Sequence, residues 1–201
     1  MMSLTNPLPN VYHLECEDSK SLADVVMRIQ EYYESPFTEL IGKKFTQELL
    51  EEVYTEKSSK PNGKDYFSYA EDWSGYNIPD YAVRGFFVLY GDDISDEERQ
   101  LKAMLRNSIE WHEKFYLIAT HKDQPLPFQS VIFSHECAHA FWYLDQEYKD
   151  HMNVLVHNLP KKMYNGLRKE LLSDGYSENV IDDEIQAYLS TDYIGDFDDW
   201  E

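Results

Sequence analysis

The sequence has only two cysteines and no long apolar run, and these absences narrow the class of protein. Two isolated cysteines, Cys16 and Cys137, argue against a disulfide framework and fit a reducing compartment. No stretch approaches the roughly 18 apolar residues that a membrane-spanning helix needs. Residues 1–7 contain neither the basic region nor the apolar core of a signal peptide. The sequence therefore predicts a cytoplasmic protein without a membrane segment.

Basic residues are also scarce, with 18 Lys and Arg against 38 Asp and Glu and a formal net charge of −20. This charge repels phosphates and argues against nucleic-acid binding. Its simplest interpretation is solubility or a salt-adapted host. The same charge favours basic substrates or partners. One alternative function is therefore an acidic decoy, which binds a basic partner without catalysis.

One short motif indicates a metal site, the HExxH pattern at His135-Glu136-Cys137-Ala138-His139. On a helix, positions i and i+4 lie about 40° apart around the axis, so both imidazoles can bind one ion from one face. Two neutral imidazoles leave room on Zn²⁺ for a third protein ligand and a water. Glu136 can reach that water as a general base. Cys137 points to the other side of the helix and is expected to be a small core residue.

The flanks of the motif favour a largely buried helix. Apolar residues cover most of the run 131–144, and Ser130 is its expected N-cap after Pro125-Leu126-Pro127. Two histidines and a glutamate on such a helix are costly unless a partner satisfies them, and a metal would do so. The alternative is a pair of hydrogen-bonded core histidines.

Two acidic residues compete to be the third ligand. Asp145 lies six residues after His139, where metzincins place theirs, but Trp142 stands where those enzymes need a glycine. We expect the helix to continue through Asp145, which then lies about 9 Å further along the axis and points away. Glu184 shares an apolar stripe with Ile185 on a second amphipathic helix, so it is the preferred ligand. The alternative is that Glu184 is one more acid in an acidic chain.

With HExxH on one helix and a ligand Glu on a later one, the chain resembles the gluzincin group of zinc metallopeptidases. The resemblance covers the motif, the expected strand 115–120 before it and residues 183–187. It implies a zinc-dependent peptidase acting on a peptide or protein substrate, with Zn²⁺ held by His135, His139 and Glu184 and with Glu136 as general base. In that family the strand nearest the cleft, here 115–120, pairs with an extended substrate. A zincin fold used only for binding is a further alternative.

Two supporting roles follow from the resemblance. A Tyr or His from the C-terminal part commonly stabilises the oxyanion, and Tyr188, one turn beyond Glu184, is the first candidate, ahead of Tyr164, His157 and Tyr193. The acid that often follows the ligand Glu by four residues is replaced here by Tyr188. Asp183 or Asp192 is therefore expected to steady a ligand His.

The whole chain predicts an α+β fold of zincin-like type, with a small mixed sheet, an active-site helix and a mainly helical C-terminal part. We expect one domain over 1–201, comprising an α+β part at 1–128 with the cleft-edge strand, a helical part at 129–195 with the metal ligands, and an acidic tail at 196–201. Strands are expected over 10–16, 81–90 and 115–120, helices over 21–33, 37–55, 95–111, 161–173 and 180–189 with N-caps Ser21, Ser95 and Ser177, and a loop over 56–64.

Overall fold

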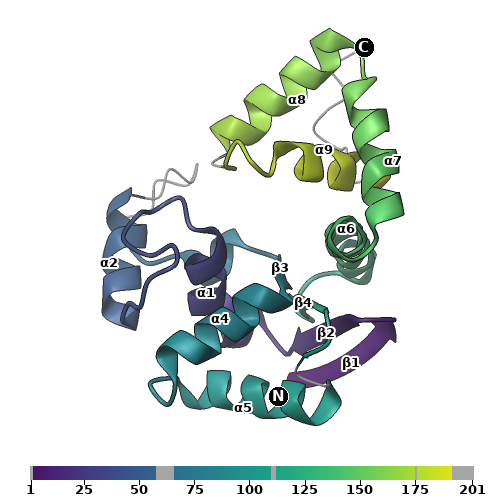
Figure 1. Ribbon diagram of the computed structural model, residues 1–201. Helices are drawn as coiled ribbons and strands as arrows, with labels where there is room; N and C mark the ends of the chain where they lie inside the picture. The colour runs from purple at the N-terminus through teal and green to yellow at the C-terminus, as the bar shows by residue number, and fades with distance from the viewer. Residues whose placement is uncertain (1, 58–65, 110–111, 175, 192–201) are drawn as a thin grey trace.

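A four-stranded mixed sheet forms the centre of the computed structural model, which describes residues 2–57, 66–109, 112–174 and 176–191 (Figure 1). The strands are β1 (Met2–Leu8), β2 (Val11–Cys16), β3 (Gly75–Pro79) and β4 (Tyr116–His121), and their order across the sheet is β1-β2-β4-β3. β2 and β4 are parallel, whereas β1 and β3 run antiparallel to their neighbours. The expected α+β class with a small mixed sheet is confirmed.

The two faces of β4 pack against different helices because alternate side chains of a strand point to opposite sides. Leu117 and Ala119 join the main core with α1 (Ser19–Glu34), while Tyr116 and Ile118 pack with Cys137 of α6 (Leu126–Leu144). Helices α2 (Gln47–Lys57), α3 (Tyr69–Asp72), α4 (Asp80–Tyr90) and α5 (Asp96–Ser108) extend the α1 side. The expected core position of Cys137 is confirmed.

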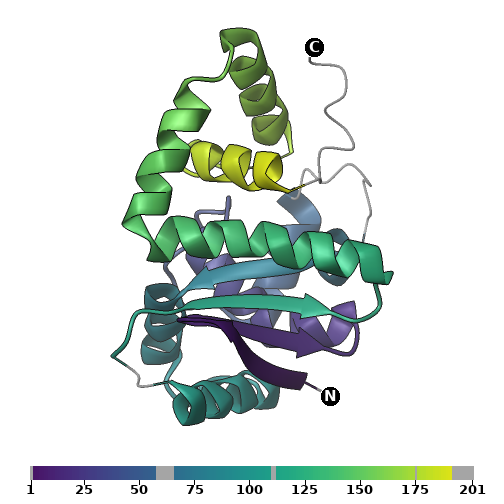
Figure 2. The same ribbon diagram turned by 90° about the vertical axis from the view of Figure 1, so that its right-hand side faces the viewer.

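Three C-terminal helices form a separate layer beyond α6. They are α7 (Gln146–His157), α8 (Lys161–Ser173) and α9 (Ile181–Ser190), and their shared core includes Val156, Leu167 and Ile185. Figure 2 shows α6 lying between the sheet and these helices. Within the described ranges, no helix is long and apolar enough to span a membrane.

The strand predicted over 81–90 is wrong, because this segment is helix α4. An unbroken apolar run has no period that separates a buried strand from a buried helix. The helical spacing is visible only in the burial, since Ala82, Val83, Phe86, Phe87 and Tyr90 are buried while Val88 is exposed. Strands β1 and β3 were not predicted.

Several predicted boundaries also move. α1 begins at Ser19 with Asp18 rather than Ser21 as its cap, since Asp18 Oδ1 accepts the Ser21 N–H at 2.6 Å. The helix predicted over 37–55 begins only at Gln47. The predicted loop 56–64 lies mostly outside the described residues, but Glu56 and Lys57 belong to α2. The elements predicted over 10–16, 115–120 and 161–173 are confirmed to within one residue.

The helices of the metal site also differ from prediction at their ends. α6 begins at Leu126 instead of after Ser130, because proline is tolerated in the first turn, where its missing N–H is not needed. It ends at Leu144, and Asp145 then caps the unpredicted α7 by accepting N–H groups from Glu147 and Tyr148. α9 begins at Ile181 without a cap from Ser177, whose hydroxyl bonds Asn179 instead.

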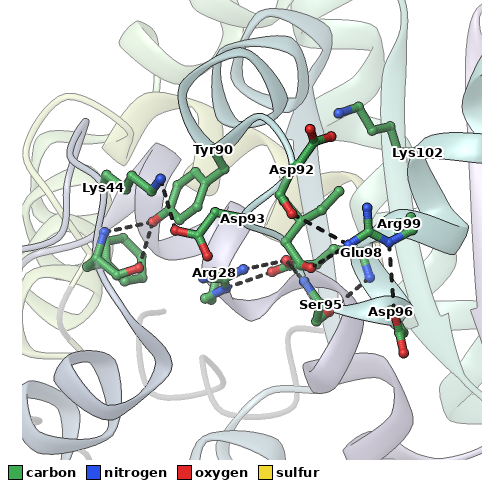
Figure 3. Close-up of polar contacts among 12 residues, drawn as sticks. Arg28, Lys44, Tyr90, Asp92, Asp93, Ser95, Asp96, Glu98, Arg99 and Lys102 are labelled. Atoms are coloured by element: carbon green, nitrogen blue, oxygen red, sulfur yellow. Dashed lines mark hydrogen bonds and ion pairs between the residues drawn. The ribbon is translucent and has the colours of Figure 1, made fainter.

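Ser95 caps α5 as predicted, in a capping box with Glu98. The Glu98 carboxylate also receives two hydrogen bonds from Arg28, at 2.8 and 2.5 Å, which join α5 to α1. Figure 3 shows Arg28 between Glu98 and the ring of Tyr90, and the guanidinium carbon lies 4.8 Å from that ring centroid. This buried ion pair holds α1, which lines the cleft described below, against α5.

Replacing Glu98 by Ala is expected to destabilise the protein by about 3 kcal/mol, because the change leaves the Arg28 charge buried without its partner. Chemical denaturation of the variant and the parent protein measures the difference. Metal content per folded molecule should stay unchanged. A decrease in the free energy of unfolding of less than about 1 kcal/mol would show that Arg28 is solvated by water or has another acceptor in the variant.

Candidate metal centre

Helices α6 and α9 bring His135, His139 and Glu184 together into a group that could hold a metal ion. The two Nε2 atoms lie 3.2 Å apart. Glu184 Oε2 lies 3.8 Å from His135 Nε2 and 3.7 Å from His139 Nε2. The i, i+4 spacing places both imidazoles on the face of α6 that meets α9. Ile185 anchors α9 in the core of the C-terminal layer, so Glu184 faces α6.

These distances fit a metal ion. The point equidistant from the three atoms lies about 2.1 Å from each, within the usual range for zinc–nitrogen and zinc–oxygen bonds. On the far side of one imidazole, His139 Nδ1 lies 2.9 Å from Asp183 Oδ1. Such a partner orients the imidazole and places its proton on Nδ1, which leaves the Nε2 lone pair of His139 for a metal.

The supporting acid predicted for a ligand histidine is therefore found at Asp183, while Asp192 lies outside the described residues. Asp145 is occupied as the cap of α7 and is absent from the metal group, so the choice of Glu184 over Asp145 agrees with the geometry. The reason differs from the predicted one, because α6 ends before Asp145 instead of carrying it past the site.

Burial and neighbouring charges shift the pKa values of the three candidate ligands strongly. Burial and the neighbouring His139 lower the pKa of His135 to about 3. Burial alone would lower the pKa of His139, but the carboxylates of Glu184 and Asp183 raise it to about 10. Burial raises the pKa of Glu184 to about 8. Together, His139 and Glu184 hold at least one proton near neutral pH that a bound metal must displace.

Metal affinity is therefore expected to rise about tenfold per pH unit between about pH 6 and pH 8, with release of about one proton. The affinity rises with pH because the raised pKa of His139 keeps its imidazole protonated in this window, and only the deprotonated imidazole can bind a metal. Isothermal titration in buffers of different ionisation enthalpy counts the proton. An affinity that does not change over this window would mean that His139 is already neutral before metal binds.

Glu136 is held beside the metal group by the edge strand β3. Its Oε2 accepts a hydrogen bond from Asn77 Nδ2 at 2.8 Å, and Asn77 Oδ1 accepts one from Tyr116 at 2.6 Å. Burial raises the pKa of Glu136, and the Asn77 hydrogen bond partly offsets that rise. The other oxygen lies close to Gly75, where an added Cβ would be only 2.9 Å from Glu136 Oε1. A strand residue and a glycine thus fix the carboxylate.

Of the candidate oxyanion donors within the described residues, Tyr188 lies at the site, whereas Tyr164 and His157 do not. Its ring centroid is 4.6 Å from that of His135, and its hydroxyl is 3.1 Å from the hydroxyl of Tyr176. Tyr164 bonds Asp182 instead, and His157 is exposed beside the same acid. Tyr193 lies outside the described residues.

The metal group opens into a cavity of about 810 Å³ between the β3 and α1 side and the segment joining α8 to α9. The prediction that strand 115–120 lies nearest the cleft is wrong. β4 is paired on both sides, whereas β3 is at the end of the sheet and lines the cavity with Gly75 and Asn77. A chain that enters the cavity can therefore pair with β3 and not with β4.

Sequence reasoning missed Gly75, Asn77 and Tyr176. A weak signal was present for the first two, because Tyr76 and Ile78 alternate with smaller residues between Gly75 and Pro79, as in a short edge strand. Tyr176 has no local signal among 16 tyrosines.

No protein-family model, curated protein or solved structure matches this chain. A functional argument must therefore come from the chemistry of the site.

Proposed function

We propose that the protein is a zinc-dependent peptidase with a zincin-like fold of gluzincin type. The observation that carries the proposal is the convergence of the Nε2 atoms of His135 and His139 with a Glu184 oxygen, beside the Glu136 carboxylate. Two imidazoles and one carboxylate form a donor set typical of catalytic zinc sites, which keep a fourth position open. The cavity supplies the access that a substrate needs.

The chain's own residues supply the proton transfer and the charge stabilisation. A bound zinc ion supplies Lewis-acid chemistry toward a peptide carbonyl and a water molecule. Glu136 removes a proton from the attacking water and delivers it to the leaving amine, in the orientation set by Asn77. The hydroxyl of Tyr188, or that of Tyr176 beside it, donates to the developing oxyanion.

The outer edge of β3 is the proposed backbone site for an extended substrate. No described strand pairs with this edge, so its N–H and C=O groups can pair with a peptide, as when a strand is added to a sheet edge. Asn77, which donates a hydrogen bond to Glu136, belongs to this strand, and so does Gly75, where an added Cβ would touch Glu136. A paired peptide therefore passes directly beside the general base.

The proposal is tested first by metal analysis and peptide hydrolysis. Protein purified without added metal should contain about one zinc per chain, and His135→Ala should lose it. A peptide library should be cleaved by the parent protein, with activity lost on chelation and restored by zinc. An acidic decoy would bind no zinc and tolerate His135→Ala. A fold used for binding alone would hold zinc and cleave nothing.

Replacing Gly75 by Ala is expected to lower kcat by about 10- to 100-fold without loss of zinc. The added methyl would lie 2.8 Å from Ile132 Cγ2 and 2.9 Å from Glu136 Oε1, so the general base must move, and small displacements of reacting groups are costly. Kinetics on a cleaved library peptide give kcat.

Gly85→Ala is the matched control for this change. Gly85 lies on α4, outside the cavity lining, and the atoms nearest to its added methyl are the hydroxyl and adjoining ring carbons of Tyr32, the hydroxyl at 2.7 Å. Equal losses in the two variants would assign the effect to general strain instead of to Glu136.

A further inference from the structure

A chain of hydrogen bonds runs from α7 through α9 to the metal group. Tyr148 of α7 donates to Gln186 Oε1 at 2.9 Å, and Gln186 Nε2 donates to Asp183 Oδ1, also at 2.9 Å. The same Asp183 oxygen lies 2.9 Å from His139 Nδ1. We call Tyr148, Gln186 and Asp183 the relay. Its polar contacts connect α7 and α9 with α6 and end on a candidate metal ligand.

The chemistry of the groups fixes the direction of each hydrogen bond in the relay. A carboxylate only accepts hydrogen bonds, so Gln186 must turn its NH₂ group toward Asp183. The amide oxygen of Gln186 then faces Tyr148, whose hydroxyl must donate. Asp183 Oδ1 therefore accepts from two sides, from Gln186 on its own helix and from His139 on α6. These two donors hold the carboxylate in the orientation that supports the imidazole.

Gln186 is deeply buried, although glutamine is mostly found at protein surfaces. It is 2% exposed, as is His139. A buried amide is costly unless its polar atoms have partners, and Tyr148 and Asp183 supply one for each end of it. Asp183 and Gln186 are three residues apart and therefore lie on one face of α9. The amide thus occupies the space between α7 and the acid that contacts the ligand histidine.

Tyr148 is held through both its backbone and its ring. Its N–H donates to Asp145 Oδ1 at 3.1 Å in the cap of α7, and its ring centroid lies 5.6 Å from that of Phe141 on α6. Phe141 follows the candidate ligand His139 by two residues. The position of the Tyr148 hydroxyl is therefore set by the first turn of α7 and by the same helix that carries the histidines.

We infer that Gln186 and Tyr148 are positioning residues of the metal centre, because their hydrogen bonds orient the acid that supports a ligand histidine. This inference rests on the metal site of the proposed function and not on peptide hydrolysis. Gln186 keeps the Asp183 carboxylate facing His139, and Tyr148 keeps the amide of Gln186 facing Asp183. Nε2 of His139 is then directed at the ion before the ion binds. Loss of Gln186 or Tyr148 leaves all three ligands in the chain and weakens the site.

The direct test is zinc affinity, measured by competition with a chromophoric chelator. The double variant Tyr148→Phe, Gln186→Met replaces both side chains by apolar ones of similar shape, so neither of the two leaves the other unpaired and the fold is kept. It should bind zinc about tenfold more weakly, the lower end of what loss of an outer partner costs. Affinity equal to that of the parent protein would overturn the inference.

Tyr164→Phe is the matched control, since it removes a tyrosine hydroxyl that joins α8 to α9 at Asp182, away from the metal group. Its zinc affinity should equal that of the parent protein, and a loss as large as in the double variant would overturn the inference. Spectra of the Co²⁺-loaded proteins separate positioning from general stability, because ligand-field absorption depends on coordination geometry. The spectrum should change in the double variant and not in Tyr164→Phe. Weaker binding with an unchanged spectrum would assign the effect to a loosened helical layer and overturn the inference.

A double-mutant cycle tests whether the effect of Gln186 passes through Asp183. Gln186→Met should weaken zinc binding by about tenfold in the parent protein, but by less than about twofold when Asp183→Ala is already present, because no carboxylate is then left to orient. Losses that multiply would show that Gln186 acts independently of Asp183 and would overturn the inference.

Peptide cleavage, measured separately, distinguishes this inference from the proposed function. A protein whose zinc affinity follows the cycle but which cleaves no library peptide would contradict the peptidase and support the positioning residues. A peptidase whose zinc affinity and Co²⁺ spectrum do not change in the double variant would do the reverse. A parent protein that takes up no zinc would contradict both.

Discussion

Glu136→Gln is expected to lower kcat for peptide hydrolysis by about 10³-fold while zinc stays bound. The amide keeps the shape of the side chain and can still accept the hydrogen bond from Asn77, so the local structure is preserved. It cannot take a proton from water, and a positioned general base contributes about 10²- to 10⁴-fold. Steady-state kinetics and elemental analysis on the same preparation measure both quantities.

Asp174→Asn is the control for this experiment, because it makes the same change of charge at the rim of the same cavity, away from Glu136. Its kcat should equal that of the parent protein. Near-normal turnover in Glu136→Gln would remove the proposed mechanism. Loss of zinc from that variant would instead give the carboxylate a structural role at the metal.

Glu184→Ala is expected to weaken zinc binding by more than about 100-fold, the upper end of what loss of an outer partner costs. The change removes the only ligand that α9 contributes to the group and leaves the two histidines on α6. Competition with a chromophoric chelator at fixed pH gives the affinity. Asp183→Asn should weaken zinc binding by about 10- to 100-fold, which is less than the loss in Glu184→Ala. This change loosens the orientation of His139 without removing a ligand.

Asp182→Ala provides the matched control, since Asp182 is also an acid of α9 but bonds Tyr164, away from the metal group. Zinc affinity in that variant should not change. If Glu184→Ala bound zinc as tightly as the parent, a different residue would have to be the third ligand, and the fit of the three donor atoms would be accidental.

The metal group could be predicted because each of its parts is periodic in the sequence. His135 and His139 repeat at helical spacing, and Glu184 interrupts an apolar stripe, so the patterns alone bring each side chain to one face of a helix. The residues that position Glu136 could not be found in this way. Gly75 and Asn77 act through the pairing of β3 with β4, and pairing partners far apart in the chain leave no local period.

The error over 81–90 has the same origin. An apolar run that is buried on most sides satisfies either a helix or a strand, and tertiary contacts decide between them. β3, which was not predicted, ends at Pro79, directly before this helix. The prediction of the chemistry was unaffected, because the ligands do not depend on strand order.

Because the candidate ligands are divided between α6 and α9, a metal ion bound there would join two parts of the chain. α6 rests on the sheet, whereas α9 belongs to the layer formed with α7 and α8. Binding free energy at such a shared site is also cohesion between the parts, because the ion binds only when both are in place. If this site holds a metal ion, the attachment of the last three helices to α6 would therefore strengthen as the concentration of free metal rises.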